Sequence, residues 1–323
     1  MDNHVLLVNK PAGILSQGDR TGDVDVAALA REYVRVAANK TGEAFVALVH
    51  RLDRPVSGVM CIARTSKAAA RLSSCLQRRE GVEKIYHAVV AGKLSGRGIR
   101  RDLLLSPPAG SEGVARHDRG PRTAVAPSGG GGDGRRDDHG SRSRHRRPRP
   151  RAASSSTEPL PAKLAELEWA AVSVSPPAAA GLRCPRTGDP RTLVRVRLIT
   201  GRKHQIRAQL AEMGHPIVGD VRYGRHFPAP ESRLLQDEDG AAIAAAGSTT
   251  PNVSPVATPS AARRLRGAVM EPLRDRSILL HASELAVPHP TRVRTVVRAR
   301  APPPAMWSEI CGRQIVNEVF GKS

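Results

Sequence analysis

One short segment places a carboxylate among three basic side chains. It runs His50-Arg51-Leu52-Asp53-Arg54-Pro55 and lies between two apolar segments that are typical of strands. Neighbouring cations favour the ionised form of an acid, so we expect Asp53 to be a carboxylate at neutral pH. Such a group can act as a nucleophile, a base or a metal ligand. Its ordinary role is a salt bridge within the loop, and the spacing alone favours that role.

A second basic segment runs from Thr200 to Arg207 and joins an expected strand to an expected helix. Its side chains Arg202, Lys203 and His204 lie where the helix should begin. Free backbone N–H groups at a helix start attract anions, so this segment suits a phosphate or a carboxylate. A solvated basic helix start is the alternative, and the segment in isolation does not choose between the two.

A third segment carries Tyr86, one of only three tyrosines in the chain. The alternation from Val82 to Val90 predicts a strand with Lys84 and Tyr86 on one face and His87 on the other. A tyrosine on a strand face is ordinarily part of the core or of its rim. This segment alone therefore identifies no chemistry.

The overall charge indicates a polyanionic partner. The chain has 323 residues and a formal net charge of +21, and its pI is about 11.2. A globular chain this basic usually binds a polyanion, and nucleic acid is the first candidate. The alternative is a solvated basic surface or a biased genome. Only 2% of the residues are aromatic, so the core must consist mainly of aliphatic side chains.

The remaining motifs exclude several classes of protein. The four cysteines are scattered and form no Cys-x-x-Cys pair, which argues against a zinc site or a disulfide framework and suits a reducing compartment. The histidines have no metal-ligand spacing, and no dinucleotide fingerprint is present. No apolar stretch has the length of a transmembrane helix, and the N-terminus lacks a signal peptide. We expect a monomer without metal or membrane, inside the cell, in the cytoplasm or, if a leader is missing, in an organelle.

Strands and helices mix without regular β-α-β alternation. This pattern predicts an α+β fold with a mixed, largely antiparallel sheet flanked by helices. Strands are expected at Val5–Val8, Phe45–Val49, Val59–Ala63, Val82–Val90, Leu167–Val174, Leu193–Ile199 and Ile278–Val287, and helices at Val26–Val36, after Thr65, at Gln205–Met213 and at Pro304–Phe320.

Composition divides the chain into three folded parts and two insertions. The folded parts are residues 1–100, 161–224 and 271–323, and the insertions are 101–160 and 225–270. Within the first insertion, Ser106–Ser156 holds eleven Arg, no Lys and five acidic residues, a net charge of +6. It has almost no large apolar side chain, so we expect a basic, disordered segment. The second insertion is of low complexity.

Taken together, the segments resemble the RluA-type pseudouridine synthase family. The match is ordered along about two-thirds of the chain, which makes it far more specific than any single motif. The matching segments are Val8–Gly13, His50–Asp53 with Ser57-Gly58, Lys84-x-Tyr86-x-Ala88, Gly201-Arg202-x-His204-Gln205-Ile206-Arg207, His215–Asp220 and Leu279–Ala282.

The resemblance implies an enzyme that isomerises uridine in ribosomal or transfer RNA, with no cofactor. Asp53 then acts at the ribose, Arg207 pairs with Asp53, and Tyr86 stacks on the base and takes the C5 proton. Arg51 helps to fill the gap left by the flipped base. The same loops imply further RNA contacts by His50, Arg54, Arg202, Lys203 and His204.

The chain departs from the family pattern in three places. Gln209 stands where the family commonly has His, and the two insertions have no recognised counterpart. No basic RNA-binding domain precedes the catalytic part, and some members of the family also lack one. The main rival is a catalytically inactive RNA-binding or ribosome-assembly protein on the same fold. A second rival is a basic nucleic-acid chaperone that uses the Arg-rich segment. The intact set of Asp53, Tyr86 and Arg207 weighs against both.

Overall fold

The computed structural model describes residues 2–39, 41–105, 124–125, 162–172, 182–183, 189–224, 273 and 275–321. Most of the two predicted insertions therefore lies outside the described residues. The strands are β1 Val5–Lys10, β2 Ala47–Leu48, β3 Ser57–Ala63, β4 Glu83–Ala91, β5 Arg97–Leu105, β6 Ala124–Val125, β7 Ala162–Ala171, β8 Leu182–Arg183, β9 Pro190–Leu198, β10 Leu280–Pro288 and β11 Val296–Arg300. The helices are α1 Val26–Ala37, α2 Ser66–Arg78, α3 Gln205–Glu212, α4 Val221–Gly224, α7 Ala305–Cys311 and α8 Arg313–Phe320.

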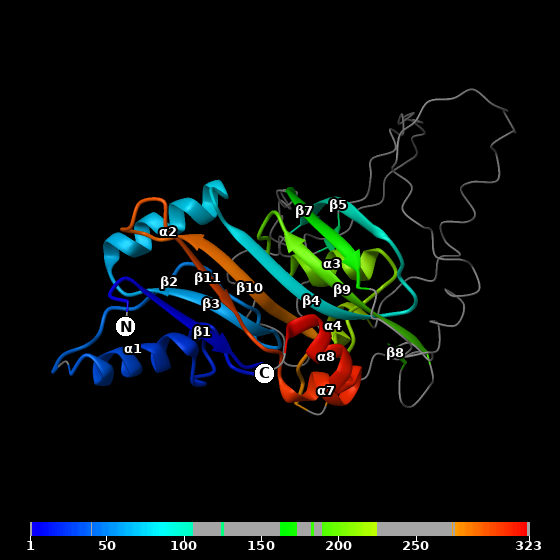
Figure 1. The fold of residues 1–323 in the computed structure, drawn as a ribbon, viewed down its shortest axis with the longest axis horizontal. Helices are drawn as coiled ribbons and strands as arrows, with labels where there is room; N and C mark the ends of the chain where they lie inside the picture. Colours follow the sequence, from blue (N-terminus) through cyan, green and yellow to red (C-terminus); the bar gives the residue numbers. More distant parts are fainter. Residues whose placement is uncertain are drawn as a thin grey trace, which may run out of the picture.

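All the described strands belong to one sheet, which runs across the molecule in Figure 1. Its main path is β1-β3-β10-β4-β9-β7-β5-β6, with β2, β8 and β11 paired to single strands of that path. Among the described pairs, β3 with β10 is parallel and the others are antiparallel. The predicted α+β class with a mixed, largely antiparallel sheet is confirmed.

Strand β3 is buried on both faces because two helices cover it from opposite sides. Val59 and Cys61 face α2 and pack with its buried Ala68 and Leu72. Ile62 faces the other way and packs against α1. Helix α1 is capped by Asp25, whose side chain accepts a hydrogen bond from Ala28 N, and α2 begins at the predicted cap. The side chain of Thr65 accepts a hydrogen bond from Ala68 N, as expected.

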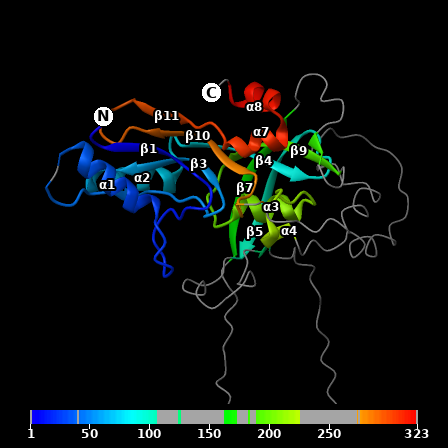
Figure 2. The same cartoon turned by 90° about the horizontal axis from the view of Figure 1, so that it is seen from below.

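The other half of the sheet is also covered on both faces. Figure 2 shows α3 and α4 on one side of β4 and β9, and α7 and α8 on the other. Trp307 of α7 is fully buried in the main hydrophobic core, and Phe320 of α8 packs against it. The pocket described below opens on the α3 side, and α7 and α8 close the far side.

The parallel pair brings distant parts of the chain into contact. Gly58 on β3 pairs with Ala282 on β10, and Ser57 pairs with His281. Gly58 has φ +124, and a Cβ at this position would overlap the Ala282 backbone. Only glycine allows this close approach. The loop that carries Asp53 is therefore tied directly to the C-terminal part of the chain.

Several predicted boundaries are wrong. Strand β5 continues to Leu105, so the first folded part extends beyond residue 100. The terminal segment is not one helix, because Gly312 adopts φ +86 and separates α7 from α8. The strand expected at Phe45–Val49 is reduced to β2, and β11 was not predicted. The disorder predicted for Ser106–Ser156 lies outside the described residues, except that Ala124–Val125 forms β6.

Candidate active site

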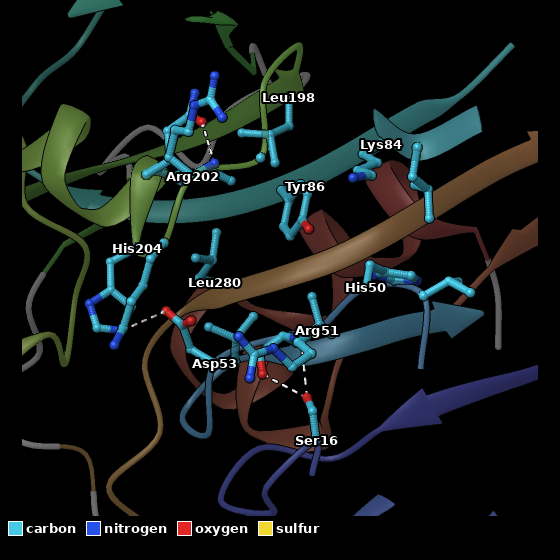
Figure 3. A pocket seen from close by; sticks show the side chains of 18 of the residues that line it. Ser16, His50, Arg51, Asp53, Lys84, Tyr86, Leu198, Arg202, His204 and Leu280 are labelled. Carbon is cyan, nitrogen blue, oxygen red and sulfur yellow. Dashed lines mark hydrogen bonds and ion pairs between the residues drawn. The ribbon is translucent and has the colours of Figure 1, made fainter. Parts of the chain in front are cut away.

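All nine candidate residues from the sequence line one pocket of about 900 Å³. They come from loops and strands that are far apart in the chain, and Figure 3 shows several of their side chains around one hollow. The nine are His50, Arg51, Asp53, Arg54, Tyr86, Arg202, Lys203, His204 and Arg207. This volume lies near the upper end for small-molecule sites, so it accommodates a nucleotide.

The loop that carries Asp53 is held rigidly by two polar side chains. The hydroxyl of Ser16 donates to Leu52 O at 2.7 Å and accepts from Leu52 N at 3.1 Å. The buried ammonium of Lys10 donates to Ile14 O at 2.8 Å and to Arg54 O at 3.2 Å. Burial lowers the pKa of Lys10 to about 8. The segments Lys10–Gly13 and His50–Arg54 therefore form one unit around the carboxylate.

Asp53 contacts a nearly buried arginine. Arg207 Nη1 donates to Asp53 Oδ2 at 3.1 Å. Arg207 exposes 7% of its side-chain surface, whereas Asp53 exposes 26%. One side of the carboxylate is thus anchored to the protein, and the other remains open to the pocket.

The same arginine binds a second carboxylate more closely. Arg207 Nε and Nη2 donate to the two oxygens of Asp220 at 2.6 and 2.9 Å. Asp220 exposes 1% of its side chain. Burial opposes the charged form of Arg207, but the hydrogen bonds and charge of Asp220, followed by Asp53, raise its pKa. The expected pairing of Arg207 with Asp53 is present through one bond, and the two-bond grip belongs to Asp220.

The imidazole ring of His204 lies beside the Asp53 carboxylate. Its Nε2 is 3.6 Å from Asp53 Oδ2, and its Nδ1 is 2.9 Å from the hydroxyl of Tyr223. The residue has φ +53, which turns the ring from the start of α3 towards the carboxylate. Burial lowers its pKa to about 4, so the ring is neutral at pH 7. A neutral imidazole is a weak phosphate ligand, and the geometry connects His204 to Asp53 instead.

Two polar groups on β4 face the pocket without a protein partner. Tyr86 is buried, and burial together with the Asp53 charge raises the pKa of its hydroxyl. Burial lowers the pKa of Lys84. Among the described residues, neither the Tyr86 hydroxyl nor the Lys84 ammonium has a hydrogen-bond partner. Figure 3 shows both side chains on the wall that faces the Asp53 loop.

The other candidates divide into exposed cations and structural groups. Arg51 and Lys203 are exposed at the rim of the pocket. Arg54 donates to Gly13 O at 2.9 Å and pairs with Asp23 at 2.8 Å. His50 Nε2 accepts a hydrogen bond from Cys61 N at 2.9 Å, and burial, then the charge of Lys84, lowers its pKa to about 3. His50 is therefore neutral and supports the loop.

Sequence reasoning missed Asp220 and Tyr223. Asp220 ends the matched segment His215–Asp220, but nothing in the segment indicates its partner. A buried arginine requires a carboxylate partner, so knowledge that Arg207 is buried would have indicated a residue such as Asp220. The sequence did not reveal this burial, because every residue of α3 from Gln205 to Ala211 is buried, polar residues included. Gln209, the departure from the family pattern, donates to Asp102 at 2.8 Å inside this packing.

Two absences apply to the described part of the chain. None of its helices is long and apolar enough to cross a membrane. Within the same residues, no group of three or more His, Cys, Asp and Glu side chains is arranged to hold a metal ion.

Comparison with known proteins identifies the family of this chain. The family model described as RNA pseudouridylate synthase matches residues 4–212. A relative from Pseudomonas aeruginosa, ribosomal large subunit pseudouridine synthase D, is 28% identical over 71% of this chain and 53% of its own length. A relative from Yersinia pestis, tRNA pseudouridine synthase C, is 29% identical over 69% of this chain and 68% of its own length.

A solved structure shows the same fold. Human RNA pseudouridylate synthase domain containing 4 superposes with a TM-score of 0.58 at 19% identity, over 98% of this chain and 91% of the human chain. The chain spans about half the length of the ribosomal relatives that it matches. The family model covers more than half of the chain and agrees with the family predicted from the sequence. The chain therefore belongs to the RNA pseudouridylate synthase family.

Proposed function

We propose that this chain isomerises specific uridines in structured RNA, of the ribosomal or transfer class, to pseudouridine. The observation that carries this proposal is the geometry of Asp53. Its carboxylate is anchored by Arg207 on one side and open on the other, in a pocket large enough for a nucleotide. The two RNA classes follow from the names of the relatives, one ribosomal and one transfer RNA synthase.

The reaction exchanges one bond to the ribose for another. The N1–C1′ bond breaks, the uracil turns, and a C5–C1′ bond forms, while a proton leaves C5 and a proton joins N1. Electrons balance without an oxidant or a reductant. The target uridine first leaves its stack, which costs a few kcal/mol. Asp53 acts at the ribose, and it either attacks C1′ or removes a proton from C2′. Both steps require the open, ionised carboxylate.

Tyr86 lies on the facing wall of the pocket, where the turned base is expected. Its raised pKa keeps the phenol protonated at neutral pH. Tyr86 therefore accepts the C5 proton only as its own proton moves on, and N1 is an acceptor that the reaction itself supplies. The aromatic ring also offers a surface on which the uracil can stack.

The exposed cations of the pocket rim suit the phosphates that flank the target uridine. Arg51 and Lys203 are exposed and point from two different segments into the same hollow. We also assign to Arg51 the filling of the space that a flipped base leaves. Cations of this kind supply the sequence-independent part of RNA affinity, and their contribution falls as salt rises.

Asp53→Asn tests the proposal most directly. Asparagine keeps the size and one hydrogen-bond acceptor, but it lacks the charge and basicity that either mechanism needs. We expect pseudouridine formation to be lost while the protein remains folded and still binds RNA. The measurements are a melting curve, an RNA titration, and tritium release from C5-labelled uridine in ribosomal and transfer RNA. Asp23→Asn is the matched control, because Asp23 is an exposed carboxylate paired with Arg54 of the same loop.

Tritium release by Asp53→Asn at the wild-type rate, with folding confirmed, would refute the mechanism. RNA binding by the wild-type chain without any pseudouridine in either RNA class would favour an inactive RNA-binding protein. If Asp53→Asn fails to fold, Asp53→Ser is measured in its place. The serine side chain is smaller, and Arg207 keeps its Asp220 partner.

A further inference from the structure

A buried carboxylate outside the pocket controls the arginine that contacts Asp53. Arg207 has five N–H donors in a planar fork. Two of them bind Asp220, at 2.6 and 2.9 Å, and a third binds Asp53 at 3.1 Å. The two contacts with Asp220 fix the plane of the guanidinium, so Nη1 can point in only one direction. Asp220 itself does not line the pocket.

Asp220 also changes the charge that Asp53 experiences. A lone buried cation beside Asp53 would bind the carboxylate strongly and reduce its basicity and nucleophilicity. Asp220 exposes 1% of its side chain and Arg207 7%, so these two form a nearly neutral buried pair. Arg207 can then orient Asp53 through one hydrogen bond, while most of its charge is compensated on the opposite edge.

Tyr223, in the same short segment, plays a matching part for His204. Its hydroxyl lies 2.9 Å from His204 Nδ1, and its ring lies under the Arg207 guanidinium, 5.0 Å from the ring centroid to Cζ. A phenol is the better donor of this pair. If it donates to Nδ1, the single proton of the neutral imidazole resides on Nε2, which faces Asp53 at 3.6 Å. Asp220 therefore acts on Asp53 through Arg207, and Tyr223 acts on it through His204.

We propose that Asp220 and Tyr223 are positioning residues of this active site. Asp220 orients Arg207 and shares its charge, and Tyr223 fixes the tautomer of His204 that presents Nε2–H to Asp53. The inference rests on the proposed function and adds to it the origin of the reactivity of Asp53. Neither residue touches the substrate.

Asp220→Asn tests the charge-sharing role. Charged and titratable groups surround Asp53 from four segments: Arg51 and Arg54 from its own loop, Arg207, His204 and Lys203 from α3 and the loop before it, Lys10 from β1, and Tyr86 from β4. Removal of the Asp220 charge leaves more of the Arg207 charge to act on Asp53, and the carboxylate becomes less reactive. The single-turnover rate at saturating RNA should fall roughly tenfold or more. RNA affinity should stay within about twofold, since Asp220 does not line the site.

Asp102→Asn is the matched control for a purely structural loss. Asp102 is also a nearly buried carboxylate with two bonds to an arginine, 2.8 Å from Arg100 Nε and 2.7 Å from Nη2. It lies on β5 and does not line the pocket that contains Asp53. Its loss should lower the melting temperature and leave the single-turnover rate at saturating RNA near the wild-type value. If Asp220→Asn loses no more of this rate than Asp102→Asn, the charge-sharing role is overturned.

Tyr223→Phe tests the second role and remains informative if Asp220→Asn does not fold. It removes one hydroxyl and keeps the ring under Arg207. The nitrogen-15 shifts of His204, assigned with His204→Gln, should report a proton on Nε2 in the wild type and a mixture of tautomers in Tyr223→Phe. The single-turnover rate should fall roughly threefold to tenfold. Tyr33→Phe on the exposed face of α1 is the control.

A wild-type His204 proton on Nδ1 would overturn the role of Tyr223. A wild-type chain that makes no pseudouridine would contradict the proposed function. If the wild type is active and Asp220→Asn and Tyr223→Phe are equally active, the proposed function stands and only the positioning role of Asp220 and Tyr223 is refuted.

Discussion

Both faces of β4 carry polar side chains, but among the described residues only those on the closed face have hydrogen-bond partners. On the closed face, His87 Nδ1 lies 2.9 Å from the hydroxyl of Ser283, and its ring packs edge-on against Phe320 with centroids 4.8 Å apart. On the open face, Tyr86 and Lys84 point into the pocket, and no described residue offers either one a hydrogen bond. Both groups are therefore available to a ligand that enters the pocket.

The difference separates a polar group that is hydrogen-bonded within the fold from two that we propose contact RNA. Burial lowers the pKa of His87 to about 4 and that of Lys84 as well, so both faces are poorly solvated. His87 is neutral and hydrogen-bonded to Ser283, whereas Tyr86 and Lys84 face the pocket. Substitutions on the two faces should therefore affect different measurements.

Tyr86→Phe should have the largest effect. The ring that we propose stacks on the uracil remains, but the hydroxyl that we propose relays the C5 proton is lost. Turnover should fall by about 100-fold or more, the usual contribution of a positioned acid–base group. The melting temperature should change little, because no described residue forms a hydrogen bond with this hydroxyl. Tritium release and calorimetry measure the two quantities. Unchanged turnover would reduce Tyr86 to a stacking surface.

His87→Leu examines the closed face and should show the reverse behaviour. The substitution breaks the bond to Ser283 and alters the contact with Phe320, at a cost of roughly 1–3 kcal/mol. The melting temperature should fall by several degrees. Single-turnover rate and RNA affinity, measured well below that temperature, should remain at wild-type values. A specific loss of turnover in a folded His87→Leu protein would break the division between the two faces.

Lys84→Met should produce the smallest effect. Methionine has a similar length without the charge, so the apo protein should become slightly more stable as a poorly solvated ammonium is removed. RNA affinity should fall about threefold to tenfold, and the salt dependence of binding should lose about one unit of slope if the ammonium binds a phosphate. Lys93→Met, at an exposed lysine that does not line the pocket, is the control. Unchanged affinity would show that Lys84 contacts no RNA.

The sequence predicted the convergence of the site better than its internal bonding. Asp53, Tyr86 and Arg207 line one pocket, as their ordered motifs suggested. The second partner of Arg207 could not be predicted, because sequence spacing does not tell which carboxylate lies at which edge of a guanidinium. His204 was assigned to RNA contacts from its basic neighbours. Its φ of +53, which turns it towards Asp53, follows from packing rather than from its residue type.

The missed elements have different physical causes. Strand β5 exposes Ile99 and Leu103, while Asp102 and Leu104 are buried on the other face. This arrangement cancels the apolar alternation that identifies a strand. The break between α7 and α8 depends on the positive φ of Gly312, and a glycine within a helical pattern does not by itself require a break.

The parallel pairing of Ser57 with His281 closes a long loop of the chain, which costs conformational entropy. Their side chains, 2.9 Å apart, are separated by 224 positions in the sequence. Closing a loop of this length costs about 5 kcal/mol, but the cost grows only with the logarithm of its length. A connection shorter by about one hundred residues would reduce this cost by only about 0.5 kcal/mol. The pairing of Ser57 with His281 therefore depends little on the length of the chain between them.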